Sequence, residues 1–254
     1  PWESVYTGTD YSYTPTVYDS DINETLTIDV TSKPNWLTWN LGILSGKPLP
    51  EHVGTQQISI EISDGTVTVV RNFTLNIILT SYVDGELQSA VNDWINDPTE
   101  RQILEDTYGH ISNWDVSNVT NMFGIFANNT SFNGDISNWD VSSVSNMAYG
   151  FHNSSFNSDI SNWDVSNLSG NALLEAFAGA QAFNQDLSGW DVSGLTDLFN
   201  VFYNCVSFNS NLSSWDVSNV TRFQQMFRGA ENFNQDLSSW DISSANNMAN
   251  MFMQ

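Results

Sequence analysis

Apolar and polar positions recur at a fixed interval in the second half of the chain. A Trp-Asp pair occurs six times, and successive tryptophans are 25, 24, 27, 25 and 25 residues apart, at Trp114, Trp139, Trp163, Trp190, Trp215 and Trp240. A period of about 25 residues is typical of leucine-rich-type solenoids, in which every coil is buried against its neighbours. The spacing therefore predicts a solenoid of six units over residues 107–254.

The spacing within one unit predicts a short strand followed by a helix. In the second unit Trp139 and Val141 alternate with polar residues, which is the two-residue period of a strand. Val144, Met147 and Phe151 then stand at i, i+3 and i+7, which places them on one side of a helix. We therefore expect one β/α unit per coil.

A serine follows each predicted strand, and a Phe-Asn pair precedes most of them. The serines suit the N-cap of the helix, where the hydroxyl would accept a hydrogen bond from an amide of the first turn; they are Ser117, Ser142, Ser166, Ser193, Ser218 and Ser243. The phenylalanines would stack as a buried spine, and the asparagines would bond the loop backbone of the next coil. These phenylalanines are Phe132, Phe156, Phe183, Phe208 and Phe233.

Two departures from the repeat occur in the third and fourth units. The third unit has two extra residues near Leu173 and Leu174, which predicts a bulge or a longer helix there. The only cysteine, Cys205, occupies the small-residue position filled by Ala180 and Ala230 in other units. We expect a buried, unreactive thiol, and a single cysteine forms neither an internal disulfide nor a cysteine metal cluster.

The first eighty residues show the two-residue period of strands. Alternating segments occur at 26–30, 57–62 and 67–79, with turn signals between them. An all-β sandwich over residues 1–80 accounts for this pattern. Residues 81–106 then contain an apolar stripe that suits a helical cap on the first coil, formed by Leu87, Ala90, Val91, Trp94 and Ile95 and ended by Pro98.

The amino-acid sequence of the repeat resembles that of a known family. Phe183–Ser188 and Phe233–Ser238 both read FNQDLS, and each is followed by a Trp-Asp segment. Over residues 81–254 the chain resembles the BspA-like leucine-rich surface proteins. The resemblance implies a right-handed strand-helix solenoid and a cell-surface role, but no particular ligand. Together with the sandwich, the expected fold is mainly β with short helices.

Residues 9–79 carry a second resemblance. Pro34–Trp39, Leu44–Pro48 and Ile62–Gly65 resemble segments of Ig-like and dystroglycan-type cadherin-like domains, which are extracellular spacer and adhesion modules. Cadherin-like domains hold Ca²⁺ at one end of the sandwich, so the resemblance implies a Ca²⁺ site with the ligands Asp19, Asp21 and Asp64. The alternative is a solvated acidic loop, since the fuller cadherin ligand motifs are missing.

The charge balance narrows the possible partners. Six Lys and Arg residues stand against 29 Asp and Glu, which gives a formal net charge of −23 at pH 7. Nucleic acid and anionic lipid surfaces would repel this chain, so we expect no nucleic-acid partner and no membrane insertion. No catalytic spacing surrounds His52, His110 or His152, and no phosphate-loop, dinucleotide or zinc motif occurs. The sequence favours a protein that is not an enzyme and has no cofactor except, in the cadherin-like interpretation, Ca²⁺.

Two acidic columns are expected on the solenoid. Stacked coils would place one aspartate per coil on the exposed sheet face, at Asp115, Asp140, Asp164, Asp191, Asp216 and Asp241. A second column, formed by Asp135, Asp159, Asp186 and Asp236, is interrupted by Asn211. Like-charged aspartates stacked in this way repel one another. Either hydrogen bonds to neighbouring serines relieve this repulsion, or the face binds a cation, a glycan or a protein. Both interpretations stand at the level of the sequence.

N-glycosylation sequons occur at Asn23, Asn72, Asn118, Asn128, Asn129, Asn153, Asn167, Asn211 and Asn219. In a eukaryotic secreted protein we expect several to carry sugars, whereas in a bacterial protein they mean little. Asn118, Asn167 and Asn219 share one repeat position, so sugars there would line one edge of the solenoid.

Apolar residues near both ends suggest self-association. Met251 and Phe252 fall partway through the sixth unit and would leave an apolar coil face open, while Trp2, Val5 and Tyr6 would form an arm before the first strand. A contact between the two would be heterologous and would propagate head to tail as a filament. Further repeats beyond residue 254 are the alternative.

The expected function is that of a non-enzymatic, extracellular structural or adhesive surface protein, which would be a glycosylated subunit of a fibril. The alternative is a recognition module that binds a glycan, a protein or Ca²⁺.

Overall fold

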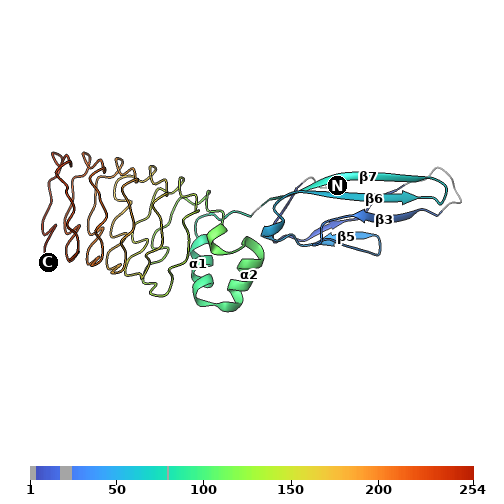
Figure 1. The fold of residues 1–254 in the computed structure, drawn as a ribbon, viewed down its shortest axis with the longest axis horizontal. Helices are drawn as coiled ribbons and strands as arrows, with labels where there is room; N and C mark the ends of the chain where they lie inside the picture. Colours follow the sequence, from blue (N-terminus) through green and yellow to red (C-terminus); the bar gives the residue numbers. More distant parts are fainter. Residues whose placement is uncertain (1–3, 18–24, 79) are drawn as a thin grey trace. The chain divides into compact units, whose positions relative to one another are not determined.

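The computed structural model describes residues 4–17, 25–78 and 80–254. The chain divides into two compact units, of which the first comprises residues 1–80 with 105–109 and the second comprises residues 81–104 with 110–254 (Figure 1). Four residues with predicted roles, Trp2, Asp19, Asp21 and Asn23, lie outside the described residues. Their roles therefore stay predictions.

The first unit contains two β-sheets that share one core. The larger sheet has the strand order β1-β7-β6-β3 and the smaller has β2-β5-β4. The strands are β1 Ser4–Tyr6, β2 Tyr11–Tyr13, β3 Thr27–Ser32, β4 Thr38–Asn40, β5 Ile43–Gly46, β6 Gly54–Ser63 and β7 Thr68–Ile78, with a 3₁₀ turn at Pro50–His52. Leu44 of the smaller sheet is fully buried in one cluster with Ile58 and Leu75 of the larger. The described residues up to Ile78 are thus all-β apart from this 3₁₀ turn, as the alternating pattern predicts.

The alternation decides which face each strand buries. In β6, Ile58 and Ile60 are buried, while the alternate residues Ser59 and Glu61 are only half-buried. β6 pairs with β7 in an antiparallel register that continues from Gly54 to Ser63. The predicted turn at Leu41-Gly42 closes the β4–β5 hairpin with φ values of 49° and 79°, the pair of left-handed residues that a two-residue hairpin turn requires.

Two helices precede the coils. α1 spans Glu86–Asn96, α2 spans Pro98–Tyr108, and a 3₁₀ turn follows at Ile111–Asn113. α1 buries Leu87, Ala90, Val91 and Trp94 of the predicted stripe. The ring of Trp94 lies 5.4 Å from that of Trp114 in the first coil, so α1 packs on the start of the coils. Among the described residues, no helix has both the length and the apolar character needed to cross a bilayer.

From residue 110 onward the chain winds in successive coils (Figure 1), and a ladder of backbone hydrogen bonds joins neighbouring coils. Alternate amides donate to carbonyls of the next coil; Met147 N lies 2.9 Å from Ala172 O, and Phe151 N lies 2.8 Å from Ala176 O. The amides between them bond within their own coil, as Gly150 N does to Met147 O at 3.0 Å. Each coil therefore depends on its neighbour for half of its ladder hydrogen bonds.

This ladder corrects the predicted strand and helix. Residues 114–254, all of which are described, contain no α-helix and no strand longer than an isolated bridge, and the segment expected to be helical is the one that pairs between coils. Each of five coils has two left-handed residues four positions apart, which interrupts a right-handed helix. They are Gly124 and Asn128, Tyr149 and Asn153, Glu175 and Gly179, Asn200 and Asn204, and Gln225 and Gly229. The expected strand is absent because the amide of Trp139 bonds three residues back, to Ile136 O.

Buried aromatic side chains form columns through the coils. In each repeat unit after the one that contains Trp114, the tryptophan indole N–H donates to a backbone carbonyl of the preceding coil at 2.8–3.1 Å. The pairs are Trp139 to Ile111, Trp163 to Ile136, Trp190 to Ile160, Trp215 to Leu187, and Trp240 to Leu212. Rings 5.3–5.7 Å apart form a column of Phe126, Phe151, Phe177, Phe202, Phe227 and Phe252. The predicted return-loop phenylalanines pack beside this column, with Phe208 3.9 Å from Phe202.

The asparagines of the return loops also behave as predicted. Asn184 Oδ1 accepts a hydrogen bond from the backbone N–H of Asn209 at 2.8 Å, and the same bond joins the other neighbouring loops. Cys205 is fully buried, and its Sγ donates to Ala180 O at 3.0 Å. Burial raises the pKa of this thiol well above its usual range, so little thiolate is available for reaction.

The two extra residues of the third unit lie slightly earlier than expected. Leu168 and Leu173 are five residues apart, whereas the equivalent Val144 and Met147 of the second unit are three apart. The longer helix is absent from this described segment, and Ala172 N donates to Ser169 O at 3.1 Å, which closes a turn. Gly170 has a φ of 62°. The extra residues are therefore accommodated just before Leu173.

Candidate functional site

The first acidic column is bonded to the serines two residues along. Asp140 Oδ1 accepts from the backbone N–H of Ser142 at 3.1 Å and from its hydroxyl at 2.6 Å. The other five aspartates accept the same backbone bond at 2.9–3.1 Å: Asp115, Asp164, Asp191, Asp216 and Asp241. The predicted N-cap is wrong in its direction: the carboxylate accepts and the serine donates, because no helix follows the serine.

The second acidic column makes the same turn. Asp135 Oδ1 accepts from Ser137 N at 3.0 Å, and Asp159, Asp186 and Asp236 each accept from the serine two residues along. Asn211, which interrupts the column, accepts from Ser213 N at 2.9 Å with its amide oxygen. The turn therefore needs an oxygen acceptor rather than a charge, so serine hydrogen bonds account for the aspartates at both positions.

These hydrogen bonds also change the acidity of individual carboxyls in the first column. The hydroxyl and backbone N–H of the following serine hold the pKa of the Asp164 and Asp216 carboxyls below their usual range. The neighbouring negative charge of Asp241 opposes this effect on the pKa of Asp216 but does not cancel it. The ionised form of each carboxyl is the one that the folded turn favours.

The predicted Ca²⁺ ligands are only partly described. Asp64 Oδ1 accepts from the backbone N–H groups of Thr66 and Val67 at 2.7 and 2.6 Å, which closes the β6–β7 turn. Asp64 also lines a cleft of about 650 Å³. Among the described residues, no group of three His, Cys, Asp or Glu side chains is placed to hold a metal ion. With Asp19 and Asp21 outside the described residues, the Ca²⁺ site stays a prediction.

The sequon asparagines of the shared repeat position are exposed but not free of contacts. Their Nδ2 atoms each donate at 3.0 Å to a serine oxygen earlier in the chain: Asn118 to Ser81, Asn167 to Ser143, and Asn219 to Ser193. An N-linked sugar replaces one of the two Nδ2 hydrogens, so this bond and a glycan are chemically compatible. Asn72, Asn128, Asn153 and Asn211 are also exposed, and Asn129 is half-buried.

The residues predicted to mediate self-association lie in different environments. Val5 and Tyr6 are not on an arm: they belong to β1 and pair with Ile77 and Ile78 of β7. This part of the prediction is wrong, because a three-residue strand is too short for its alternation to show. At the other end Met251 is buried, whereas Phe252 is 58% exposed.

A surface that the sequence analysis missed runs along the ladder. One buried residue begins the ladder segment of each coil, and these residues are Met122, Met147, Leu173, Leu198 and Phe223. We define the ladder face as four residues per coil: the one before this residue, and the first, second and fifth after it. They are Asn121, Phe123, Gly124 and Ala127; Asn146, Ala148, Tyr149 and His152; Ala172, Leu174, Glu175 and Ala178; Asp197, Phe199, Asn200 and Tyr203; and Arg222, Gln224, Gln225 and Arg228. The opening residue itself is always apolar, while these four columns vary from coil to coil.

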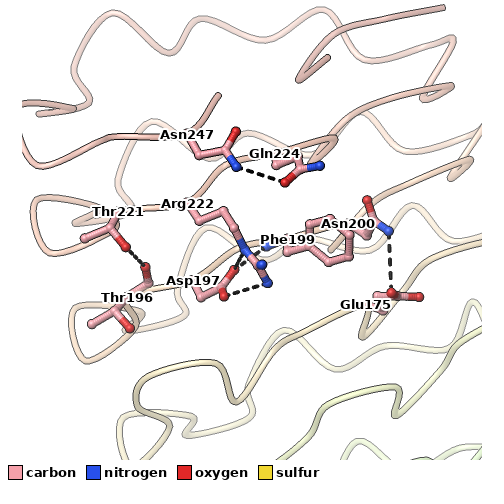
Figure 2. Close-up of polar contacts among 9 residues, drawn as sticks. All are labelled: Glu175, Thr196, Asp197, Phe199, Asn200, Thr221, Arg222, Gln224 and Asn247. Atoms are coloured by element: carbon pink, nitrogen blue, oxygen red, sulfur yellow. Dashed lines mark hydrogen bonds and ion pairs between the residues drawn. The ribbon is translucent and has the colours of Figure 1, made fainter. Parts of the chain in front are cut away.

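Side chains of the ladder face contact one another across coils. Arg222 forms two bonds to Asp197, Nη2–Oδ2 at 2.8 Å and Nε–Oδ1 at 2.9 Å, and its guanidinium lies 4.4 Å from the ring centre of Phe199 (Figure 2). Arg228 lies 5.8 Å from the ring centre of Tyr203. From residue 110 onward the sequence has no lysine and two arginines, Arg222 and Arg228, and both lie on this face.

Glu175 is the polar centre of the face. Its Oε2 lies 3.5 Å from His152 Nδ1 and its Oε1 lies 3.5 Å from Asn200 Nδ2 (Figure 2 shows the second contact). Burial, and then the charge of Glu175, raise the pKa of Tyr149 above its usual value. In the sequence this surface is marked by positions whose residue changes from coil to coil. A search for the constant Trp-Asp positions does not detect them.

Two family descriptions match the chain. Residues 101–174 and 171–254 match "Mycoplasma protein of unknown function, DUF285", and residues 3–78 match "Putative Ig domain". The second match agrees with the two-sheet unit and with the resemblance stated for residues 9–79. No curated protein matches the chain.

Solved structures with partial similarity are endo-fucoidan hydrolases from glycoside hydrolase family 107. MfFcnA4 is 29% identical over 30% of this chain and 12% of its own, with a TM-score of 0.27. MfFcnA9 is 23% identical over 29% of this chain and 14% of its own, with a TM-score of 0.24. The chain thus spans a small fraction of these enzymes, and their activity is a statement about those proteins.

Proposed function

We propose that this chain, which belongs to the family described as "Mycoplasma protein of unknown function, DUF285" through two matches over residues 101–254, is a non-enzymatic structural and adhesive protein of the cell surface. The resemblance to BspA-like surface proteins supports this role. In this proposal an Ig-like sandwich precedes a right-handed solenoid of six coils, and the protein lies outside the cell. The solenoid is the scaffold, and the sandwich is a spacer or adhesion module.

The observation that supports a scaffold is the use of the repeated polar groups. The indole N–H of Trp163 bonds the preceding coil, Asn184 Oδ1 bonds the next loop, and Asp140 Oδ1 holds its own turn. Each of these contacts recurs along the stack. A polar atom that already has its partner inside the fold contributes to the architecture rather than to chemistry on a substrate. The residues that make this repeat recognisable are therefore structural.

The proposal extends to assembly. Phe252 and Met253 of the sixth coil are 58% and 48% accessible. We propose that this apolar face contacts another copy head to tail, which gives a filament unless the rotation closes a ring. Sugars on the exposed sequons and the net charge of −23 would keep neighbouring filaments apart. Since Val5 and Tyr6 lie in the β-sheet, the accepting surface is not those two residues.

Light scattering of the full chain tests the assembly. We expect the mass to rise with protein concentration, and Phe252→Asp to hold the protein at the mass of one chain. Phe123→Asp is the matched control, because Phe123 is 53% exposed on the ladder face of the first coil. A full chain that stays monomeric at high concentration, or equal effects of the two variants, would refute head-to-tail assembly.

The second candidate is a recognition module. Its form with a cation on the acidic columns is weakened by the serine hydrogen bonds, whereas Ca²⁺ at Asp19, Asp21 and Asp64 rests on the cadherin-like resemblance alone. Calorimetry with Ca²⁺ and then with a chelator separates the two. A rise in the melting temperature of the sandwich with Ca²⁺ would favour recognition, and no change in either unit would leave the scaffold as the better account.

A further inference from the structure

We propose that the ladder face binds a neutral polysaccharide, with Tyr149 and Tyr203 as principal contact residues. This goes beyond the scaffold function, because it assigns a ligand class to a surface that the scaffold does not require. It also places recognition away from the acidic columns.

The aromatic residues of the ladder face are not needed to build the coils. The column that contains Phe123 and Phe199 has Ala148 at the same place in the second coil. Likewise the column of Tyr203 has Ala127 in the first coil. The ladder hydrogen bonds continue through all these coils, so small residues satisfy the fold at the same positions. The coil therefore does not demand aromatic rings at these positions, and a partly exposed tyrosine offers part of its ring to a sugar.

The backbone at Tyr149 carries strain that the fold could avoid. Tyr149 has a φ of 61° and Glu175 a φ of 52°. Gly124 occupies the same column with a φ of 63°, where a glycine adopts this conformation without a steric penalty. Bulky residues in the left-handed region persist when another role holds them there. The two strained residues stand next to each other in neighbouring coils, beside His152.

The polar groups of the face match hydroxyl groups rather than a charged ligand. Asn200 Oδ1 is shielded from water and has no hydrogen-bond partner among the described residues. Glu175 hydrogen-bonds the Tyr149 side chain and has contacts of 3.5 Å to His152 and Asn200, so it holds the polar groups of the face together. A sugar hydroxyl both donates and accepts, so it is suited to a mixed set of amide, carboxylate and imidazole groups.

The charges argue against a polyanion. Arg222 forms two bonds to Asp197 (Figure 2), and with Glu175 and Arg228 the face has equal numbers of acidic and basic side chains. The net charge of −23 repels anionic polymers at longer range. Tyr149 and Tyr203 lie in the second and fourth coils, so a ligand that contacts both must extend along the stack, as a linear chain does.

Affinity electrophoresis of the full chain is the test. Native gels would contain one neutral polysaccharide each, namely hydroxyethylcellulose, xyloglucan, glucomannan, galactan or dextran, with heparin and alginate gels as anionic comparisons. We expect slower migration in at least one neutral gel. Tyr149→Gly should weaken this binding about tenfold, because the ring is lost while the left-handed backbone is relieved. Tyr203→Ala should do the same, and the double variant should migrate as in a plain gel.

Two controls keep the result interpretable. Asp164→Asn changes the acidic column and should not alter the retardation. Phe252→Asp should abolish assembly but keep polysaccharide binding, so the failure of one proposal is distinguishable from the failure of the other. Retardation in no neutral gel, retardation only by heparin or alginate, or unchanged retardation of the folded double variant would each overturn the proposal.

Discussion

The two units satisfy their backbone hydrogen bonds in different ways. In the sandwich, β6 and β7 pair continuously from Gly54 to Ser63 in an antiparallel ladder. In the coils, alternate amides bond the next coil and the rest close turns within their own, as Met147 and Gly150 illustrate. The sandwich therefore contains unique contacts, whereas the coils repeat a few contacts in columns. A substitution in a column should spread to neighbouring coils, while one in the sandwich should stay within that unit.

Removal of a stacked ring should give the largest effect. Phe177 is fully buried and lies 5.3 Å from Phe151 and 5.7 Å from Phe202. Phe177→Ala should lower the free energy of unfolding of the coils by about 3–5 kcal/mol, because it leaves a cavity in the middle of a column. Denaturant titration followed by tryptophan fluorescence and by circular dichroism measures the change.

The matched variant in the sandwich is Leu75→Ala, since Leu75 is also fully buried. It should destabilise the sandwich by about 2–5 kcal/mol and leave the coil transition in place. If either variant shifts both transitions equally, the two units do not unfold independently, and the contrast between columns and unique contacts fails.

A glycine in the ladder should show how close the coils are. Gly179 has a φ of 74°, and an added Cβ would lie 2.1 Å from Asn153 Oδ1. Gly179→Ala should therefore cost the backbone penalty of about 1 kcal/mol plus a clash of about 1–3 kcal/mol. Gly170→Ala is the control, because Gly170 has a φ of 62° with nothing within 4 Å of the added Cβ. Thermal unfolding of both variants should show the larger loss at Gly179, and equal losses would mean that the contact with Asn153 does not matter.

How much the sequence predicts differs between the units for a physical reason. Alternation at Ile58 and Ile60 has one common structural solution, a strand with one buried face, and the structure has it. The spacing of Val144, Met147 and Phe151 has two: a helix, or turns of three and four residues broken by left-handed positions. Tyr149 gives no sign of its positive φ in the sequence, since left-handed backbone is expected of glycine or asparagine. The helix prediction was therefore wrong although the buried residues were correct.

The same distinction applies to functional residues. The constant columns, such as Trp163 and Asp140, are the easiest to see in the sequence, and the structure shows their polar atoms bonded within the fold. The pairing of Asp197 with Arg222 depends on the register between coils, which composition and spacing within one unit do not contain. The variable columns point to a surface, but only the register shows which of their residues meet.

Loss of one indole hydrogen bond should have an intermediate effect. Trp190 Nε1 donates to Ile160 O at 3.1 Å in the buried interior. Trp190→Phe keeps an aromatic ring but leaves that carbonyl without its donor, which should cost about 1–3 kcal/mol. Urea unfolding of the coils measures it, with Trp36→Phe in the sandwich as the control, because Trp36 Nε1 has no hydrogen-bond partner among the described residues. A loss no larger than that of the control would show that the indole bonds do not hold the coils together.

The smallest effect is expected in the acidic columns at neutral pH. Asp216 Oδ1 accepts from Ser218 N at 3.0 Å, and Asn211 makes the equivalent bond to Ser213 with an amide oxygen. Asp216→Asn should therefore change the melting temperature at pH 7 by no more than about 1 °C, whereas Asp216→Ala should lower it further because the turn loses its acceptor. Equal instability of the two variants would mean that the negative charge itself is needed, which would restore the cation-binding interpretation of the column.

Acid should reveal the same bonds collectively. Hydrogen bonds from the following serine lower the pKa of Asp164, Asp186, Asp216, Asp236 and Asp241 in the folded coils. A carboxyl whose folded pKa lies below its ordinary value of 3.8 binds its proton more readily after unfolding. The stabilisation is thus complete above about pH 4 and is lost as the pH falls through the lower, folded pKa values.

The melting temperature of the coils, measured between pH 7 and pH 2, should show a plateau followed by a decline in this acidic range. Asp216→Asn, which has no proton to gain there, should decline less steeply than the unaltered chain, and an equal or steeper decline would show that these turns do not prefer the ionised carboxylate.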